Sequence, residues 1–180
     1  MDTPEAFEEI FERHGAAVWS YCRRRVGRDA AEEVLAETFL VAYRRRGRFD
    51  PSYDSARPWL LGIATNLIRR RLRDERTHFE RIRQVPVSIA SDDVADVDRV
   101  DAQRLRPILI EALRALSPDD RETFLLVAVG ELTYSEAASA LGVPVGTVRS
   151  RIHRARSVLR ERIPAFPAID DEGGANDDHG

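Results

Sequence analysis

Residues 133–156 read TYSEAASALGVPVGTVRSRIHRAR, and this stretch holds the two helices and the turn that decide the fold. Thr133 and Glu136 stand three residues apart, as in a capping box, and predict the start of a short helix that Gly142 would end. After the turn, apolar residues recur at helical spacing and predict a longer helix. A short capped helix, a tight turn and a longer helix are the proportions of a helix-turn-helix.

The longer helix would turn two kinds of side chain in opposite directions. Its buried side is predicted from apolar residues at the spacing of one helical face, which are Val148, Ile152, Ala155, Leu159 and Ile163. Its N-terminal part carries polar residues that could enter the major groove, where one arginine can donate to guanine O6 and N7 together. The alternative is a solvated basic face on a packing helix. The candidate DNA contacts are Thr147, Arg149, Ser150, Arg151, His153 and Arg154.

Helical spacing also extends through the first half of the chain, and no segment alternates convincingly as a strand would. A first helix is predicted from Pro4 up to Gly27. A second is predicted from an Asp29 cap, with Glu32 in the capping-box position, to a stop at Gly47. Both helices would place one apolar stripe toward a common core.

A third helix carries its apolar stripe over residues 59–72. Much further along the chain, the stripe at residues 105–116 predicts a fourth helix. Ser117 as a cap and Pro118 in the first turn predict a fifth, which Gly130 would end. With the helix-turn-helix, the chain is predicted to be all-α, with three helices in its first part and four in its second.

Charge divides the chain into four blocks, and all 28 basic residues are arginine. Residues 1–76 hold 15 arginines and 13 acidic residues, and residues 102–163 hold 10 and 7, so both blocks are mildly basic. Residues 77–101 hold six acidic residues and three arginines, while residues 164–180 hold five and none. We therefore expect two small helical domains, a flexible acidic linker between them and an acidic disordered tail.

Several classes of protein are excluded by composition. No apolar run approaches the roughly 18 residues of a transmembrane helix, and the N-terminus lacks the pattern of a signal peptide. The single cysteine, Cys22, cannot form an internal disulfide, and the four histidines form no metal-binding or catalytic pattern. We expect a cytoplasmic protein with no membrane insertion, no metal, no cofactor and no enzymatic activity.

Four short motifs in the second half resemble the fourth conserved region of the extracytoplasmic-function (ECF, group 4) sigma factors of the sigma-70 family. They are ALRALSPDDR at 112–121, GELTYSEAA at 130–138, VPVGTVRSR at 143–151 and RAR at 154–156. In the first half, ETF at 37–39, WL at 59–60 and IATN at 63–66 resemble the second conserved region. The resemblance covers about residues 5–76 and 102–163.

The resemblance implies a subunit that gives bacterial RNA polymerase its promoter specificity by binding the −35 element through region 4 and melting the −10 element through region 2. Its implied partners are the β′ clamp and β flap of the polymerase core, promoter DNA and an anti-sigma factor. The implied clamp-binding residues are Glu32, Glu33, Leu35, Ala36 and Glu37. The family often has glutamine in place of Ala36, and Glu32 and Glu33 can equally act as charges that favour a helix start.

Melting of the −10 element would need a pocket for an unstacked base and a cationic track for the single strand. Asn66 offers both a donor and an acceptor to a base edge. Phe49 and Tyr53 could wall such a pocket or could instead be local core residues, which is the role we expect for Trp59. The cationic track would consist of Arg69, Arg70 and Arg73.

The acidic segments allow two further hypotheses. Residues 77–101 could extend to about 80 Å, at about 3.3 Å per residue, and so span a spacer of about 16 base pairs, which covers about 55 Å. The resemblance implies that this linker passes through the RNA channel of the polymerase as a mimic of nucleic acid; a solvating spacer is the alternative. The tail could compete with DNA for the arginines of the last helix, or it could serve solubility alone.

A stand-alone helix-turn-helix regulator, with an N-terminal helical sensing or dimerising domain, is the alternative function. Dependence on polymerase separates the two, because a regulator binds its operator alone. A third class, an enzyme built on a helical bundle, would need a cluster of titratable or metal-binding groups, and no such cluster is evident in the sequence.

Overall fold

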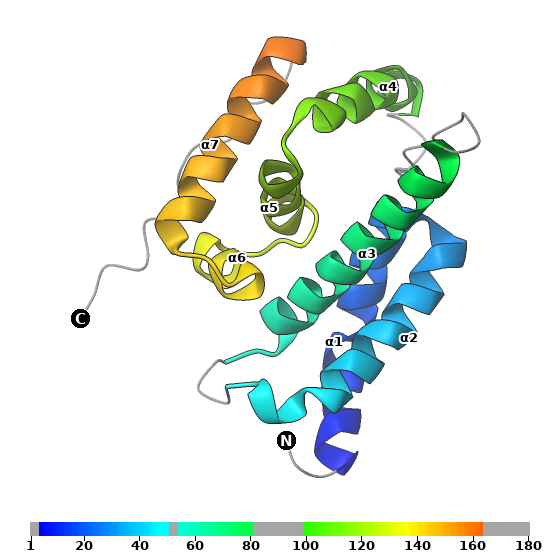
Figure 1. The fold of residues 1–180 in the computed structure, drawn as a ribbon, viewed down its shortest axis with the longest axis vertical. Coiled ribbons are helices and arrows are strands. Elements are labelled where there is room, and N and C mark those ends of the chain that lie inside the picture. The colour runs from blue at the N-terminus through cyan, green and yellow to red at the C-terminus, as the bar shows by residue number, and fades with distance from the viewer. Residues whose placement is uncertain (1–3, 51–53, 81–98, 164–180) are drawn as a thin grey trace. The chain divides into compact units, whose positions relative to one another are not determined.

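The computed structural model describes residues 4–50, 54–80 and 99–163 and divides the chain into two compact units, Met1–Ser91 and Asp92–Gly180 (Figure 1). These described residues form seven α-helices and one short 3-10 helix, and none of them lies in a strand. The prediction of an all-α chain with two helical domains is confirmed. Tyr53, residues 81–98 of the predicted linker and the predicted tail lie outside the described residues.

The first unit is a bundle of three helices. They are α1 (Pro4–Val26), α2 (Arg28–Arg44) and α3 (Arg57–Glu80), and the 3-10 helix η1 (Arg46–Arg48) follows α2. Each of the three helices packs against the other two (Figure 1). Burial of apolar side chains is the main term that stabilises such a bundle. The largest fully buried ones are Val18, Tyr21, Leu60, Leu61 and Ile68.

The start of α2 differs from the prediction, because Asp29 does not cap it. Gly27 is the N-cap residue, with a φ of 82°, and no side chain bonds to the first turn. The Gly27 carbonyl instead accepts the N–H of Ala31 at 3.1 Å. Glycine adopts this left-handed backbone without steric cost, so the chain turns there and α2 begins at once. Asp29 lies inside the first turn, where its negative charge interacts favourably with the positive end of the helix dipole.

Two helices extend into the segment 77–101 that the sequence predicts to be a linker. α3 continues to Glu80 and α4 begins at Arg99. The sequence THFE at 77–80 contains neither proline nor glycine, so nothing in it stops a helix that is already formed. At the end of α2, the helix stops at Arg44, and the predicted stop, Gly47, lies within η1.

The second unit contains α4 (Arg99–Ala115), α5 (Pro118–Ala128), α6 (Tyr134–Leu141) and α7 (Val145–Arg162). The predicted signals at its helix ends are confirmed: Ser117 caps α5, with Pro118 at its start, and Gly142 ends α6. The capping box of α6 is complete, because the Glu136 N–H donates to Thr133 Oγ1 (3.2 Å) and the Thr133 N–H donates to Glu136 Oε2 (2.8 Å). α7 packs against α4, α5 and α6 (Figure 1).

A tight turn at Gly130 joins α5 to α6. A Cβ atom on Gly130 would lie 2.5 Å from the carbonyl oxygen of Leu126, so only glycine lets the two backbone segments come this close. Glu131 follows with a φ of 53°, and the Leu132 N–H then donates to the same Leu126 carbonyl at 3.2 Å. These contacts fix the place where α6 begins.

Candidate nucleic-acid interface

The turn of the helix-turn-helix lies between α6 and α7. Gly142 has a left-handed backbone, with φ 65° and ψ 38°, and the Val143 N–H donates to the Ala138 carbonyl at 3.1 Å. Pro144 is extended and is the N-cap residue of α7. No acidic residue lies in the first turn of α7, so the positive end of its dipole is not offset from within the helix. This end of α7 therefore suits an anion such as a DNA phosphate.

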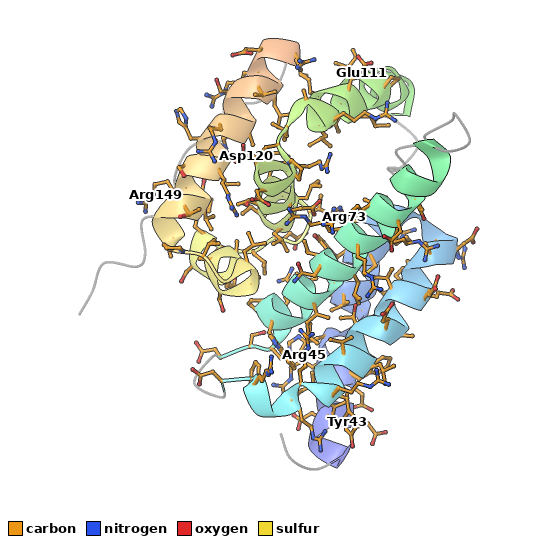
Figure 2. All side chains as sticks on the ribbon, viewed as in Figure 1. Tyr43, Arg45, Arg73, Glu111, Asp120 and Arg149 are labelled. Carbon is orange, nitrogen blue, oxygen red and sulfur yellow. The ribbon has the colours of Figure 1, made fainter. Side chains whose placement is uncertain are left out.

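The buried and exposed sides of α7 follow the sequence pattern. The predicted inward residues are all buried, and they are Val148, Ile152, Ala155, Leu159 and Ile163. Arg149, Ser150 and His153 are exposed, and Thr147 is half-buried. The Ser150 hydroxyl donates to the Thr147 carbonyl at 3.0 Å, which holds it against its own helix. Figure 2 shows Arg149 pointing away from the rest of the second unit.

Two of the predicted DNA contacts are engaged within the protein. Arg151 Nη2 lies 3.1 Å from Asp119 Oδ2, and Arg154 Nη2 lies 2.7 Å from Asp120 Oδ1. The side chain of Arg151 is only 17% exposed, so the expectation that it projects outward is wrong. Arg154 remains 56% exposed and can still meet a ligand. The sequence motif SPDD at 117–120 predicts a helix start, but nothing in its pattern shows that its two aspartates accept from two arginines of α7.

The carboxyl group of Asp120 is held in its charged form. Burial raises its pKa, but hydrogen bonds from Arg154 and Ser117, together with the charges of Arg154 and Arg151, outweigh burial and lower the pKa below its ordinary value. The backbone N–H of Asp120 also donates to Ser117 Oγ at 3.1 Å. The start of α5 is thus a fixed negative charge beside α7.

In the first unit, four of the predicted −10 residues lie along one side of α3. Asn66 is exposed, and at about 100° per residue Arg69, Arg70 and Arg73 follow it on the same side. Asn66 makes no hydrogen bond among the described residues. Phe49 and Trp59 are both half-buried, and their ring centroids are 5.3 Å apart, so each ring packs partly against the other. Figure 2 shows Arg73 on this helix.

A buried polar network that sequence reasoning missed lies directly behind Asn66. The hydroxyl groups of Tyr21 and Thr65 are hydrogen-bonded at 2.8 Å, and Arg25 Nη1 donates to the Tyr21 hydroxyl at 2.6 Å. All three side chains are buried. The network ties α1 to the turn of α3 that carries Asn66, and a satisfied buried network of this kind favours one arrangement of the helices.

The predicted clamp-binding residues form an exposed face of α2. Glu32, Glu33, Ala36 and Glu37 are exposed and Leu35 is half-buried. Glu33 is also joined to α3, because Arg71 Nη1 lies 2.5 Å from its Oε2. Leu40 and Tyr43, which were not among the predicted residues, extend this face with side chains that are 48% and 38% exposed. Their spacing of four and seven residues from Ala36 is the signal that could have identified them.

Other kinds of site are not found in the part of the chain that the structure describes. It contains no group of three or more His, Cys, Asp or Glu residues that could hold a metal ion. Cys22 is fully buried, and burial raises the pKa of its thiol to about 12, which opposes its use as a nucleophile. Among the described residues, no helix has the length and apolar character needed to cross a membrane.

Comparison with known proteins agrees with this geometry. Residues 10–78 match the family described as Sigma-70 region 2, and residues 106–159 match Sigma-70, region 4. The chain is 36% identical over 165 residues to the RNA polymerase sigma factor CarQ of Myxococcus xanthus, covering 88% of this chain and 90% of the relative. It is 32% identical over 157 residues to the ECF RNA polymerase sigma factor SigC of Mycobacterium tuberculosis, covering 86% and 81%. The chain belongs to the ECF sigma factors.

This sigma factor therefore serves promoter-specific initiation by RNA polymerase. The match of its first unit to region 2 removes the alternative of a sensing or dimerising domain attached to a stand-alone regulator. Sigma factors are non-catalytic initiation factors.

Two solved structures share the fold of this sigma factor. CnrH, solved in complex with the cytosolic domain of CnrY, is 26% identical, with a TM-score of 0.61 over 92% of each chain. RpoE of Bartonella quintana, solved with the anti-sigma factor NepR, has a TM-score of 0.67 over 91% of this chain and 99% of its own. At 23% identity, the second comparison supports the fold alone.

Proposed function

We propose that this sigma factor reads the −35 element with the N-terminal half of α7 and holds the melted −10 strand on α3. The proposed −35 contact rests on the exposure of Arg149 and on its lack of an internal partner among the described residues. Arg149 is exposed near the start of α7, and among the described residues its side chain has no hydrogen bond or ion pair. An exposed arginine without an internal partner at this end of a recognition helix is free to bridge guanine O6 and N7.

The other −35 candidates differ in what they can contribute. Ser150 and His153 are exposed beside Arg149 and can reach base edges or phosphates. Arg154 can add contacts from the part of its guanidinium that Asp120 does not use. Arg151 is mostly buried against Asp119, so it supports the helix better than it could support a base contact.

For the −10 element, the exposed Asn66 amide is available to the edge of an unstacked base. Trp59 lies about two helical turns before Asn66 on α3, and Phe49, which precedes α3, packs against it; either ring could stack on a neighbouring base. The arginines that follow Asn66 on the same side of α3 would track the strand phosphates. This arrangement supports melting by region 2 because a base contact and a phosphate track share one helix face.

For the polymerase, we propose that the exposed face of α2 docks on the β′ clamp. It combines acidic residues with two exposed apolar ones, Leu40 and Tyr43, so it offers both charge complementarity and apolar area. Ala36 lies at the centre of this face and removes the polar contact that glutamine would make. The second unit would meet the β flap.

An anti-sigma partner is proposed because, of two proteins that share this fold, RpoE was solved with the anti-sigma factor NepR and CnrH with the cytosolic domain of CnrY. We also propose that the protein acts in the cytoplasm, where core polymerase and promoters are found, and that it has no enzymatic activity of its own.

In vitro transcription with bacterial core polymerase and a promoter library would test the proposal. Wild-type protein should enrich promoters with a shared −35 sequence. Arg149→Ala should weaken recognition of that sequence by about 1–3 kcal/mol if the contact is bidentate to guanine. Arg160→Ala, at an exposed position near the other end of α7, is the matched control. Equal promoter selectivity for wild type and Arg149→Ala would contradict the placement of α7 on the −35 element.

A further inference from the structure

Asp120, in the first turn of α5, reaches across to the recognition helix. Arg154 Nη2 lies 2.7 Å from Asp120 Oδ1, and Arg154 Nε lies 3.3 Å from Oδ2. The guanidinium thus meets the carboxylate through two parallel hydrogen bonds, which fix its direction as well as its charge. Figure 2 shows Asp120 between α5 and α7.

The two partners differ in exposure. The side chain of Asp120 is 11% exposed, whereas that of Arg154 is 56% exposed. The backbone of Asp120 is itself held, because its N–H donates to the Ser117 cap. The Asp120 carboxylate is therefore the fixed partner, and the direction of the Arg154 side chain depends on it.

The pair leaves much of the guanidinium unused. An arginine has five N–H groups, and the Asp120 contact takes one on Nε and one on Nη2. The three that remain, two on Nη1 and one on Nη2, have no partner among the described residues. They belong to a side chain that is more than half exposed, so a ligand can reach them.

Arg154 also borders the surface proposed to face DNA. At about 100° per residue, Ser150 and His153 lie between Arg149 and Arg154 around the axis of α7. Arg149 and Arg154 therefore flank one exposed strip from its two sides. Of these two arginines, Arg154 is tied to a carboxylate and Arg149 is not.

We propose that Asp120 is a positioning residue for −35 recognition, which holds Arg154 in the direction that presents its three remaining N–H groups to the DNA. The proposal rests on the proposed −35 role of α7. Its physical basis is preorganisation: an arginine already fixed in the free protein loses less rotamer entropy when it binds. The lowered pKa of Asp120 supports the same reading, because the carboxylate stays charged whenever the protein is folded near neutral pH.

Charge alone predicts the opposite effect of removing Asp120, so the direction of the change in DNA affinity separates the two explanations. Asp120 is a negative charge beside the site of a polyanion, so its removal should strengthen binding to any DNA if the charge alone matters. If Asp120 positions Arg154, the change Asp120→Asn should weaken binding to the −35 sequence even though the net charge has become more favourable.

The test compares Asp120→Asn, Arg154→Gln and the double variant with wild type, each as the full chain assembled with bacterial core polymerase. The probes are a promoter duplex selected by the wild-type holoenzyme and the same duplex with its −35 sequence scrambled. Asp120→Asn should lower affinity for the selected promoter about tenfold, in the range of one base-specific contact, with no loss on the scrambled duplex. In the Arg154→Gln background it should cause no further loss.

Glu111→Gln is the charge-matched control, because Glu111 is exposed on α4 and Figure 2 shows it well away from Asp120. It should leave the preference for the selected promoter unchanged. All affinities are measured below the melting transition of each variant, so that a loss of folding is recognised separately.

Three outcomes would overturn the positioning role of Asp120. They are unchanged or tighter binding of Asp120→Asn to the selected promoter, an equal loss on both duplexes, and a loss that persists in the Arg154→Gln background. If Arg154→Gln itself leaves promoter binding unchanged, the proposed −35 role of Arg154 fails and the inference fails with it. A loss in Arg154→Gln without one in Asp120→Asn overturns the inference alone.

Discussion

Replacement of Asn66 by alanine should change folding and function in opposite directions. Asn66 is exposed on α3 and its side chain makes no hydrogen bond among the described residues, so the substitution removes no contact of the fold. Alanine has the higher helix propensity, which should stabilise the first unit by up to about 0.7 kcal/mol. Loss of one base contact should cost about 1–3 kcal/mol in the open complex. That range is about a 5- to 150-fold loss of melted promoter.

The assay is permanganate reactivity of unpaired thymines at the −10 region, measured on holoenzyme with wild-type or Asn66→Ala protein. Assembly with core polymerase and binding to the −35 duplex should stay at wild-type levels, because the proposed clamp and −35 contacts lie on α2 and α7. Glu12→Ala, an exposed position on α1, controls for truncation of a surface side chain. Wild-type permanganate reactivity in Asn66→Ala would refute the base-contact role.

Three other predictions concern the fold. Thr133→Ala removes the cap of α6 and should destabilise the second unit by about 0.5–2 kcal/mol, measured by urea unfolding against the exposed Ser139→Ala control; no difference between them would contradict it. Cys22 should react with iodoacetamide much more slowly in the folded protein than in urea, because its thiol is buried and its pKa is raised to about 12; similar rates would show an open core. The pKa of Asp120 is lower in the folded protein than in the unfolded chain, where it is about 3.9. The charged carboxylate therefore stabilises the fold above that unfolded value, and this contribution is lost as the pH falls through the folded pKa. The free energies of unfolding of wild type and Asp120→Asn should therefore converge in acid.

Most of the fold could be predicted because its signals are local. A cap and its partner stand three residues apart, and a buried stripe repeats every three or four residues, so both can be recognised within one helix. Thr133, Glu136 and Gly142 were predicted on this basis and are confirmed. The prediction that Asp29 caps α2 was wrong for a reason that is also local. Gly27 is a second possible N-cap two residues earlier, and the sequence pattern alone does not decide between Gly27 and Asp29.

The candidate sites were harder to predict, because their side chains depend on partners far along the chain. Arg154 is paired across 34 residues, Arg71 across 38, and Tyr21 meets Thr65 across 44. No spacing rule identifies such pairs before the helices are placed. Position along α7 correctly predicted Arg149 as exposed, but the same reasoning could not show that Arg151 turns toward α5.

The division of α7 into an inward and an outward side has a consequence for how promoter choice can evolve. The side chains that anchor α7, such as Val148 and Ile152, are separate from exposed Arg149, Ser150 and His153. Substitutions at the exposed positions should each alter stability by no more than about 0.5 kcal/mol. If α7 reads the −35 element as proposed, a lineage can therefore exchange these three residues one at a time and acquire a new regulon while every intermediate still folds. Arg154 is the exception, since a change there strands the buried Asp120 carboxylate and calls for a second, compensating mutation in α5.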